Sequence, residues 1–248
     1  MQGQTEGLPS DNPVVDGAFE YRYLTDTLVP LAHPVGEDIS LGEQSLLLGA
    51  HNGCGSLIPA FCKEYTKGSG KKVVAIHAAR GATKIEEWLP GTARYRALVN
   101  KINKGVEKAN EMERVDNVRF VWLQGCSDAI AHTSLQAYKD AFTVLKNALK
   151  KDTGISAFGI IRVGYFAKTV RWLKVGTQEE KTLYDEAIMQ AQEGIVRENG
   201  DSVMLTRVCA DLSLDETYIN PYEDGHYNNA GMERIGADAA KTALRIWK

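Results

Sequence analysis

The feature that most constrains the fold is an alternation, from Lys72 onward, of short β-branched runs with longer segments of helical period. The β-branched runs span residues 73–79, 118–123, 155–163 and 202–208. Apolar residues at three-and-four spacing fill the segments 93–112, 134–150, 177–200 and 229–247. This alternation is typical of a parallel sheet with helices on both faces. We therefore expect an α/β protein, a three-layer α/β/α sandwich with a mostly parallel sheet.

Capping residues mark the ends of one of the predicted helices. Thr177 with Glu180 forms the pattern of a capping box at the start of a helix that Gly200 ends. The region 2–55 is rich in Pro, Gly, Asp and Asn, so it predicts long loops with a few turns of helix. A loop region of this length is usually functional, and we expect it to run beside the site.

Composition excludes several classes of protein. The chain has 248 residues, 44% of them hydrophobic and 25% charged, which predicts one domain spanning 1–248. Net charge is -3 with cations and acids interleaved, so no basic face is expected to bind nucleic acid. The longest apolar stretches, such as 73–79, are too short to cross a bilayer.

The four cysteines, Cys54, Cys62, Cys126 and Cys209, form neither a CxxC pair nor a metal-ligand pattern with histidine. We interpret them as free thiols of a cytoplasmic protein. A leader upstream of Met1 would instead direct secretion. No metal or organic cofactor is expected, because no cluster of ligands is visible in the sequence.

Two strand ends carry groups that could stabilise an oxyanion. Gly81 follows the run 73–79, where a glycine lets its N–H approach a developing negative charge. Gln124 follows the run 118–123 and could donate its side-chain amide. The simpler interpretations are a plain strand-to-helix turn at Gly81 and a buried polar turn at Gln124, with Ser127 or Asp128 capping the next helix.

A third junction, residues 222–231, precedes the last helical segment and holds Asp224 and His226. A carboxylate beside a histidine can orient the imidazole while its other nitrogen takes a proton from a hydroxyl. Cys126 has no histidine near it in the sequence, so we interpret it as an inert thiol. Structural or solvent-exposed rings are expected at the remaining histidines, His33, His51, His77 and His132.

Taken in order, these junctions resemble the sialate O-acetylesterase and acetylxylan esterase branch of the SGNH (GDSL-like) hydrolases. That family carries a G-Q-S-N-M nucleophile segment, a G-G-T turn before a Trp, a W-x-Q-G-E-S-D-A stretch and a D-G-x-H-x-x-x-x-G close. Residues 80–88 are similar to the second pattern, 122–129 to the third and 224–231 to the fourth. The resemblance covers almost the whole chain and implies a flavodoxin-like SGNH hydrolase fold.

The chain departs from the family pattern in two of these motifs. Cys126 stands where the family has a glutamate. The closing motif is one residue shorter, so Asp224 lies two positions before His226 and Glu223 three positions before it. Either acid could orient the ring, and we favour Asp224 because its shorter side chain suits the following Gly225.

The third departure from the family pattern concerns the nucleophile. Residues 1–3 fit the tail of the nucleophile pattern, which places the serine upstream of Met1 and the first strand outside the sheet. Unpaired strand edges would then be exposed. A second alignment makes Thr5 the nucleophile, but too few apolar residues precede it for a central strand. Ser45 is a third candidate, and no strand pattern precedes it.

The resemblance implies a carbohydrate O-acetylesterase that takes a small-molecule or oligosaccharide acetyl ester. His226 would activate the serine with Asp224 behind it, and Gly81 and Gln124 would hold the oxyanion. Tyr21, Tyr23 and Trp88 are expected to offer faces to a sugar ring or to lie in the core. The alternatives are a non-catalytic carbohydrate-binding pseudoenzyme and a lipid-directed esterase or thioesterase. No long apolar groove-forming segment supports the lipid-directed enzyme.

Overall fold

A three-stranded parallel sheet lies at the centre of the molecule. The computed structural model describes residues 8–9, 11–49, 55–222 and 224–247. In this sheet β6 (Arg119–Trp122), β7 (Ala157–Ile161) and β8 (Ser202–Thr206) pair in the order β6-β7-β8. These strands fall inside three of the four predicted β-branched runs, and their parallel pairing is confirmed.

A second sheet is built by the N-terminal region. Its order is β2-β1-β5, in which β1 (Ala18–Arg22) runs antiparallel to β2 (Thr27–Pro30) and parallel to β5 (Val73–Ala75). A separate hairpin joins β3 (Ile39–Leu41) to β4 (Gln44–Leu47). The prediction of loops with a few helical turns over 2–55 is therefore wrong for the described part of that region. These strands are short, and β1 places the acidic Glu20 in a buried position, so their hydrophobic pattern is weak.

The predicted strand 73–79 is also too long, because only Val73–Ala75 forms a ladder, with residues Ala18, Phe19 and Glu20 of β1. Among the described strands, β5 pairs with β1 and β6 pairs with β7, and no ladder joins β5 to β6. Each of these two strands therefore has one edge that no described strand pairs.

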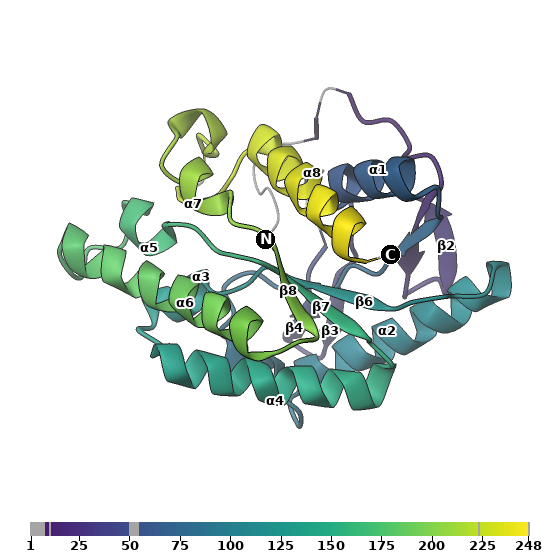
Figure 1. Cartoon of the computed structure of the whole chain (residues 1–248), viewed down its shortest axis with the longest axis horizontal. Helices are drawn as coiled ribbons and strands as arrows, with labels where there is room; N and C mark the ends of the chain where they lie inside the picture. The colour runs from purple at the N-terminus through teal and green to yellow at the C-terminus, as the bar shows by residue number, and fades with distance from the viewer. Residues whose placement is uncertain (1–7, 10, 50–54, 223, 248) are drawn as a thin grey trace.

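Helices cover both faces of the β6-β7-β8 sheet (Figure 1). On one face lie α1 (Ile58–Ser69) and α8 (Asn229–Ile246), and on the other lie α2 (Ala93–Met112), α4 (Leu135–Thr153) and α6 (Gln178–Glu198). Alternate residues of β7 serve the two cores, since Phe158 and Ile160 pack with the α2, α4 and α6 side and Ile161 with the α8 side. The predicted three-layer α/β/α arrangement is confirmed.

Short helices fill the connections between strands and long helices. They are η2 (Ile85–Trp88), α3 (Cys126–Ile130), α5 (Phe166–Thr169), α7 (Cys209–Leu212) and η3 (Glu216–Tyr218). Four of them, η2, α3, α5 and α7, are the first described helices after strands β5, β6, β7 and β8. None of the helices in the described ranges combines the length and apolar character needed to span a bilayer.

Side-chain caps set the starts of the long helices, as the sequence predicts for α6. The Thr177 hydroxyl accepts a hydrogen bond from Glu180 N at 3.2 Å, and the Glu180 carboxylate accepts one from Thr177 N at 2.7 Å. This capping box is confirmed. The helix ends at Glu198 rather than at Gly200, with Asn199 as its C-cap. Helix α1 is not predicted by the sequence analysis; Gly70, at φ 68°, ends it.

Candidate active site

The Gly81 turn lies beyond the carboxyl end of β5. Gly81 is exposed, and the following Ala82 has a left-handed φ of 55°. Thr83 then turns inward, where its hydroxyl donates to the Arg80 carbonyl at 2.8 Å and accepts from Trp88 Nε1 at 3.0 Å. These contacts fix the turn and leave the Gly81 backbone at the surface.

The Gln124 turn is bonded directly to the Gly81 segment. The side-chain amide nitrogen of Gln124 donates to the Thr83 carbonyl at 2.8 Å and to the Asp128 carboxylate at 2.6 Å. A second link between the two segments is the Ile85 N–H, which donates at 2.9 Å to the Asp128 carboxylate oxygen that accepts from Gln124. The structure thus brings the Gln124 turn together with residues 83–85, which follow Gly81.

Asp128 is the residue that joins the two segments, a role that the sequence analysis did not assign to it. Its side chain is buried, with 1% of its surface exposed, and it also accepts from the Thr133 hydroxyl at 3.0 Å. Desolvation raises the pKa of this carboxyl, and the hydrogen bonds from Gln124 and Ile85 oppose the rise. Asp128 does not cap the next long helix, because Ser134 caps α4.

Both amide hydrogens of Gln124 are engaged in the contacts just described. Its backbone carbonyl is also held, by the Tyr138 hydroxyl at 2.9 Å and by the Gln192 amide at 2.9 Å. For this side chain to donate to an oxyanion, one of its two amide hydrogens would have to leave the Thr83 carbonyl or the Asp128 carboxylate. The oxyanion role of Gln124 and Gly81 stays a prediction.

Cys126 follows the Gln124 turn at the start of α3. Desolvation raises the pKa of its thiol, and the negative charge of Asp185 adds to the rise. A thiol with a raised pKa is a poor nucleophile at neutral pH, in accord with its interpretation as inert. Cys62, Cys126 and Cys209 are free, as predicted, and Cys54 lies outside the described residues.

The His226 loop packs on α5 and on the segment after it. The imidazole meets the Phe166 ring edge-on, with 5.2 Å between ring centroids. Gly225, at φ 77°, passes so close to Val170 that a Cβ there would lie 2.4 Å from a valine methyl group. The backbone is fixed by Asn220 N, which donates to the His226 carbonyl at 2.7 Å. A glycine before His226 is therefore required by both backbone conformation and space.

Asp224 contacts both His226 and Arg171. Its backbone carbonyl lies 3.3 Å from His226 Nδ1, while its carboxylate accepts from Arg171 Nε at 2.8 Å and from the Arg171 backbone N–H. The carboxylate is thus held by a cation that the sequence analysis did not connect with this loop. Glu223, the other acid considered for orienting His226, lies outside the described residues.

Helix α6 connects the Gln124 turn with the His226 loop. Gln192 donates to the Gln124 carbonyl and accepts from Val163 N at 2.9 Å. Two turns earlier, the Asp185 carboxylate accepts from the N–H groups of Ala167 and Lys168, both at 2.9 Å, and so fixes α5 beneath His226. Desolvation raises the pKa of Asp185 from 3.8 to about 6, against the lowering effect of these hydrogen bonds.

The other candidate nucleophiles and the aromatic residues considered for sugar binding are described next. Ser45 is on β4, where its carbonyl accepts from Arg94 at 3.3 Å and its hydroxyl is buried without a hydrogen-bond partner among the described groups. Thr5 and residues 1–3 lie outside the described residues. Tyr21 and Trp88 are core residues with 0% and 2% of their surface exposed, so they offer no face to a sugar; Tyr23 is half-buried under Lys104.

The other described histidines have structural surroundings. His77 is buried, and desolvation lowers the pKa of its imidazole to about 3. Desolvation also lowers the pKa of His33, whose Nδ1 accepts from Ser56 N at 3.3 Å. The exposed His132 stacks on Tyr184 with 3.8 Å between ring centroids. His51 lies outside the described residues.

Comparison with solved structures supports the fold. The chain is similar to a protein from Arabidopsis thaliana whose X-ray structure was determined at 1.6 Å resolution. The TM-score is 0.65 at 16% sequence identity, and the alignment covers 98% of this chain and 87% of the other. At this identity the likeness establishes the fold. No curated protein matches the sequence.

Comparison with protein families identifies the family in addition to the fold. The family described as "Carbohydrate esterase, sialic acid-specific acetylesterase" matches residues 24–245, which include the Gly81, Gln124 and His226 segments. The match covers most of the chain. The protein therefore belongs to this family of carbohydrate esterases.

Proposed function

We propose that this protein hydrolyses acetyl esters on sugars at the edge of the sheet that carries Gly81, Gln124 and His226. The observation that carries the proposal is the bonded connection between the two predicted oxyanion segments, through Gln124 to Thr83 and Asp128 to Ile85. Helix α6 is hydrogen-bonded both to the Gln124 turn and to α5. The His226 loop packs on α5. Family membership supplies the reaction class.

In the proposed mechanism His226 is the general base. It takes a proton from a serine hydroxyl that attacks the acetyl carbonyl, and it returns the proton to the sugar hydroxyl as that group leaves. A water activated in the same way then releases acetate from the acyl-enzyme. Negative charge on the carbonyl oxygen would be met by Gly81 N–H, the Gln124 amide and the N–H of the nucleophile. We assign Asp224 to the orientation of His226.

The nucleophile is proposed to be a serine encoded upstream of Met1. Ser45 fits poorly, because its strand is bonded to Arg94 of α2 and its hydroxyl has no described partner that would accept its proton. A serine beside His226 would need to enter at the same edge of the sheet as Gly81 and Gln124.

The proposal is tested by measuring acetate release from p-nitrophenyl acetate and from an O-acetylated sialic acid. The chain given is compared with a chain whose reading frame is extended upstream. We expect turnover in the extended chain and a loss of about 10³-fold or more in kcat/KM in its His226→Ala variant. His132→Ala, which removes an exposed ring, is the matched control. Activity that survives His226→Ala would refute the assignment of the base.

A second function is a carbohydrate-binding protein without catalysis. Two observations favour it: the internal engagement of both Gln124 amide hydrogens, and Cys126 at the position of the family's glutamate. An extended chain that keeps its serine, binds an acetylated sugar and releases no acetate would support this second function over the first.

A further inference from the structure

The Asp224 carboxylate is turned toward Arg171, which lies in the segment that follows α5. Its Oδ1 accepts from Arg171 Nε at 2.8 Å, and its Oδ2 accepts from the Arg171 backbone N–H. Only 20% of the Asp224 side chain is exposed, whereas 83% of the Arg171 side chain is exposed. Both oxygens of this largely covered carboxylate are therefore engaged by a single residue at the surface.

The group of Asp224 that faces His226 is its backbone carbonyl. The carbonyl oxygen lies 3.3 Å from His226 Nδ1. Gly225 stands between the two residues at φ 77°, a left-handed conformation that turns the chain so that the carbonyl and the half-buried ring meet. Catalytic hydrogen bonds are often this long until substrate binds and tightens them. The distance therefore suits a hydrogen bond between Nδ1 and the carbonyl.

Such a hydrogen bond selects the tautomer of the His226 imidazole. A carbonyl oxygen only accepts hydrogen bonds, so Nδ1 must carry the proton when it faces the carbonyl. Nε2 is then the unprotonated nitrogen, the one that can take a proton from a hydroxyl. A backbone carbonyl can therefore set the same tautomer as a carboxylate, although it brings no full negative charge to the ring.

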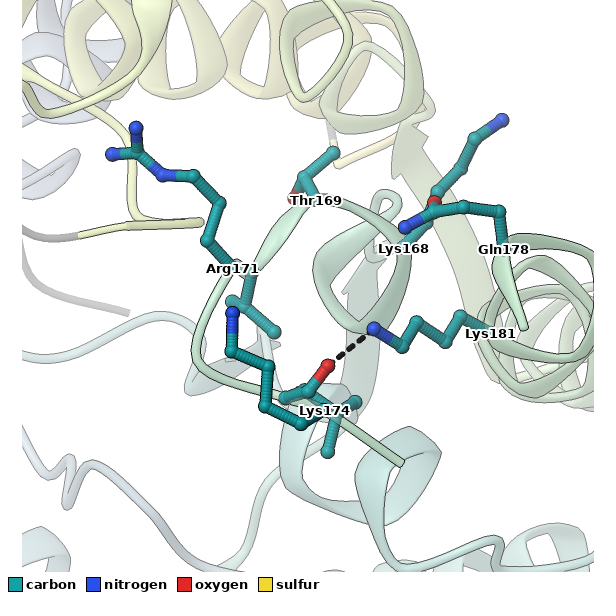
Figure 2. Close-up of a pocket in the computed structure, with 8 residues that line it drawn as sticks. Lys168, Thr169, Arg171, Lys174, Gln178 and Lys181 are labelled. Atoms are coloured by element: carbon teal, nitrogen blue, oxygen red, sulfur yellow. Dashed lines mark hydrogen bonds between the residues drawn. The ribbon is translucent and has the colours of Figure 1, made fainter. Parts of the chain in front are cut away.

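The segment that carries Arg171 is fixed on both sides of this residue. Val170 N donates to the carbonyl of the first residue of α5 at 3.0 Å, and Lys181 of α6 donates to the Leu173 carbonyl (Figure 2). Figure 2 shows the Arg171 side chain pointing away from Lys181. Arg171 thus connects the His226 loop to a segment whose backbone is held by α5 and α6.

We propose that the Asp224 backbone carbonyl orients His226 and that Arg171 is the positioning residue that holds this carbonyl in place. The inference rests on the role of general base proposed above for His226. In this arrangement the Asp224 carboxylate fixes the loop by binding Arg171, and the carbonyl accepts the hydrogen bond from Nδ1. The imidazolium that forms during catalysis then meets a carbonyl dipole at Nδ1 rather than a carboxylate.

The test is the tautomer of neutral His226, read by NMR from the chemical shifts of its two ring nitrogens in the 248-residue chain. We expect the form with the proton on Nδ1 to be the major one. Arg171→Met and Asp224→Asn remove the same ion pair from its two ends and keep the carbonyl, so each should lower the ratio of Nδ1–H to Nε2–H about threefold. The double variant should lower the ratio no further, because the two changes remove one interaction. Arg171→Lys, which keeps a cation, should retain most of the ratio.

Arg207→Met is the matched control, because it removes an exposed arginine that binds Glu193 at 2.6 and 2.7 Å, and it should leave the ratio unchanged. A carboxylate that orients the ring itself predicts a different result: Asp224→Asn would lower the ratio far more than Arg171→Met, and this would overturn the proposal. A larger loss in Glu223→Gln than in Arg171→Met would also overturn it, as would a wild type in which Nε2–H is the major form. Because neither nucleophile nor substrate takes part in the measurement, a failure of the proposed hydrolysis would leave these results intact.

Discussion

Asp128 is hydrogen-bonded to both of the predicted oxyanion segments. Its buried carboxylate accepts from Gln124, Ile85 and Thr133. We expect Asp128→Ala to lower the free energy of unfolding by about 3 kcal/mol or more, because three donors lose a charged acceptor. Urea denaturation measures the change. Asp140→Ala, at an exposed position of α4, should leave the midpoint unchanged, and an equal effect of both variants would contradict this role of Asp128.

Asp185 should make stability depend on pH. Because burial raises its pKa from 3.8 to about 6 in the folded chain, the unfolded chain loses the proton first as pH rises. The contribution of Asp185 therefore falls between about pH 4 and pH 6, by on the order of 3 kcal/mol. Relative to Asp185→Asn, the wild type should lose this amount of stability from pH 4 to pH 7. Parallel stability profiles of the two proteins would contradict the raised pKa.

Some residues of the candidate site could be predicted from the sequence and others could not, for a physical reason. Gly81, Gln124 and His226 stand at strand ends or before a helix, where position along the chain predicts position in a sheet. The role of Asp128 depends on Ile85, 43 residues away, and that of Arg171 on Asp224, 53 residues away. Such partners are set by the packing of helices, which no local pattern encodes.

Among the elements, α6 connects most parts of the site. It supplies Gln192 to the Gln124 turn, Asp185 to α5 and Lys181 to the Leu173 carbonyl in the segment after α5 (Figure 2). Asp185 and Gln192 are seven residues apart, two helical turns, so they lie on one face of the helix. A displacement of α6 would therefore disturb the Gln124 turn and the support of His226 together.

The cap of α6 gives a test of this element. Thr177→Ala removes the hydroxyl that accepts from Glu180 N, so we expect a loss of about 1 kcal/mol in the free energy of unfolding. Thr182→Ala is the matched control, because its hydroxyl bonds to the Gln178 carbonyl inside the helix and alanine has the higher helix propensity. Thermal denaturation that shows Thr182→Ala to be the more harmful change would refute the role of the cap.

Long helices were more predictable than short strands. The segments 93–112, 134–150, 177–200 and 229–247 match α2, α4, α6 and α8 to within a few residues, because a periodic stripe over several turns and a side-chain cap both occur in the sequence. Strands β1 to β4 have three to five residues each, too few for alternation to be recognised. Helix α1 was not predicted; it lies between a glycine-rich region and the first clear strand pattern.

For the whole molecule, a buried ion pair fixes the loop after β2 to helix α2. Lys101 of α2, with 0% of its surface exposed, lies 3.1 Å from Glu37, which also accepts from the N–H groups of Tyr23 and Leu24. Desolvation raises the pKa of Glu37, but the hydrogen bonds from Leu24, Tyr23 and Lys101 outweigh it and hold the pKa below 4.5. The β1-β2 hairpin is thus fixed to α2 by charge.

Removal of this pair should cost more stability than any surface change. We expect Lys101→Met to lower the free energy of unfolding by about 3–5 kcal/mol, because Glu37 is left buried without its cation. Lys108→Met, two helical turns away near Asp26 and Glu111, should have a much smaller effect. Denaturant unfolding in which the two variants behave alike would show that the buried pair does not hold the β1-β2 hairpin to α2.

Reaction with a fluorophosphonate probe, followed by mass-spectrometric mapping of the labelled peptide, tests most directly whether this edge of the sheet is an ester-hydrolysing site. Such probes label serines that a neighbouring base has activated. In the chain extended upstream we predict one labelled serine in the added segment, with the label lost in His226→Ala. Labelling of Ser45, or labelling that His226→Ala leaves unchanged, would contradict an active site built around His226.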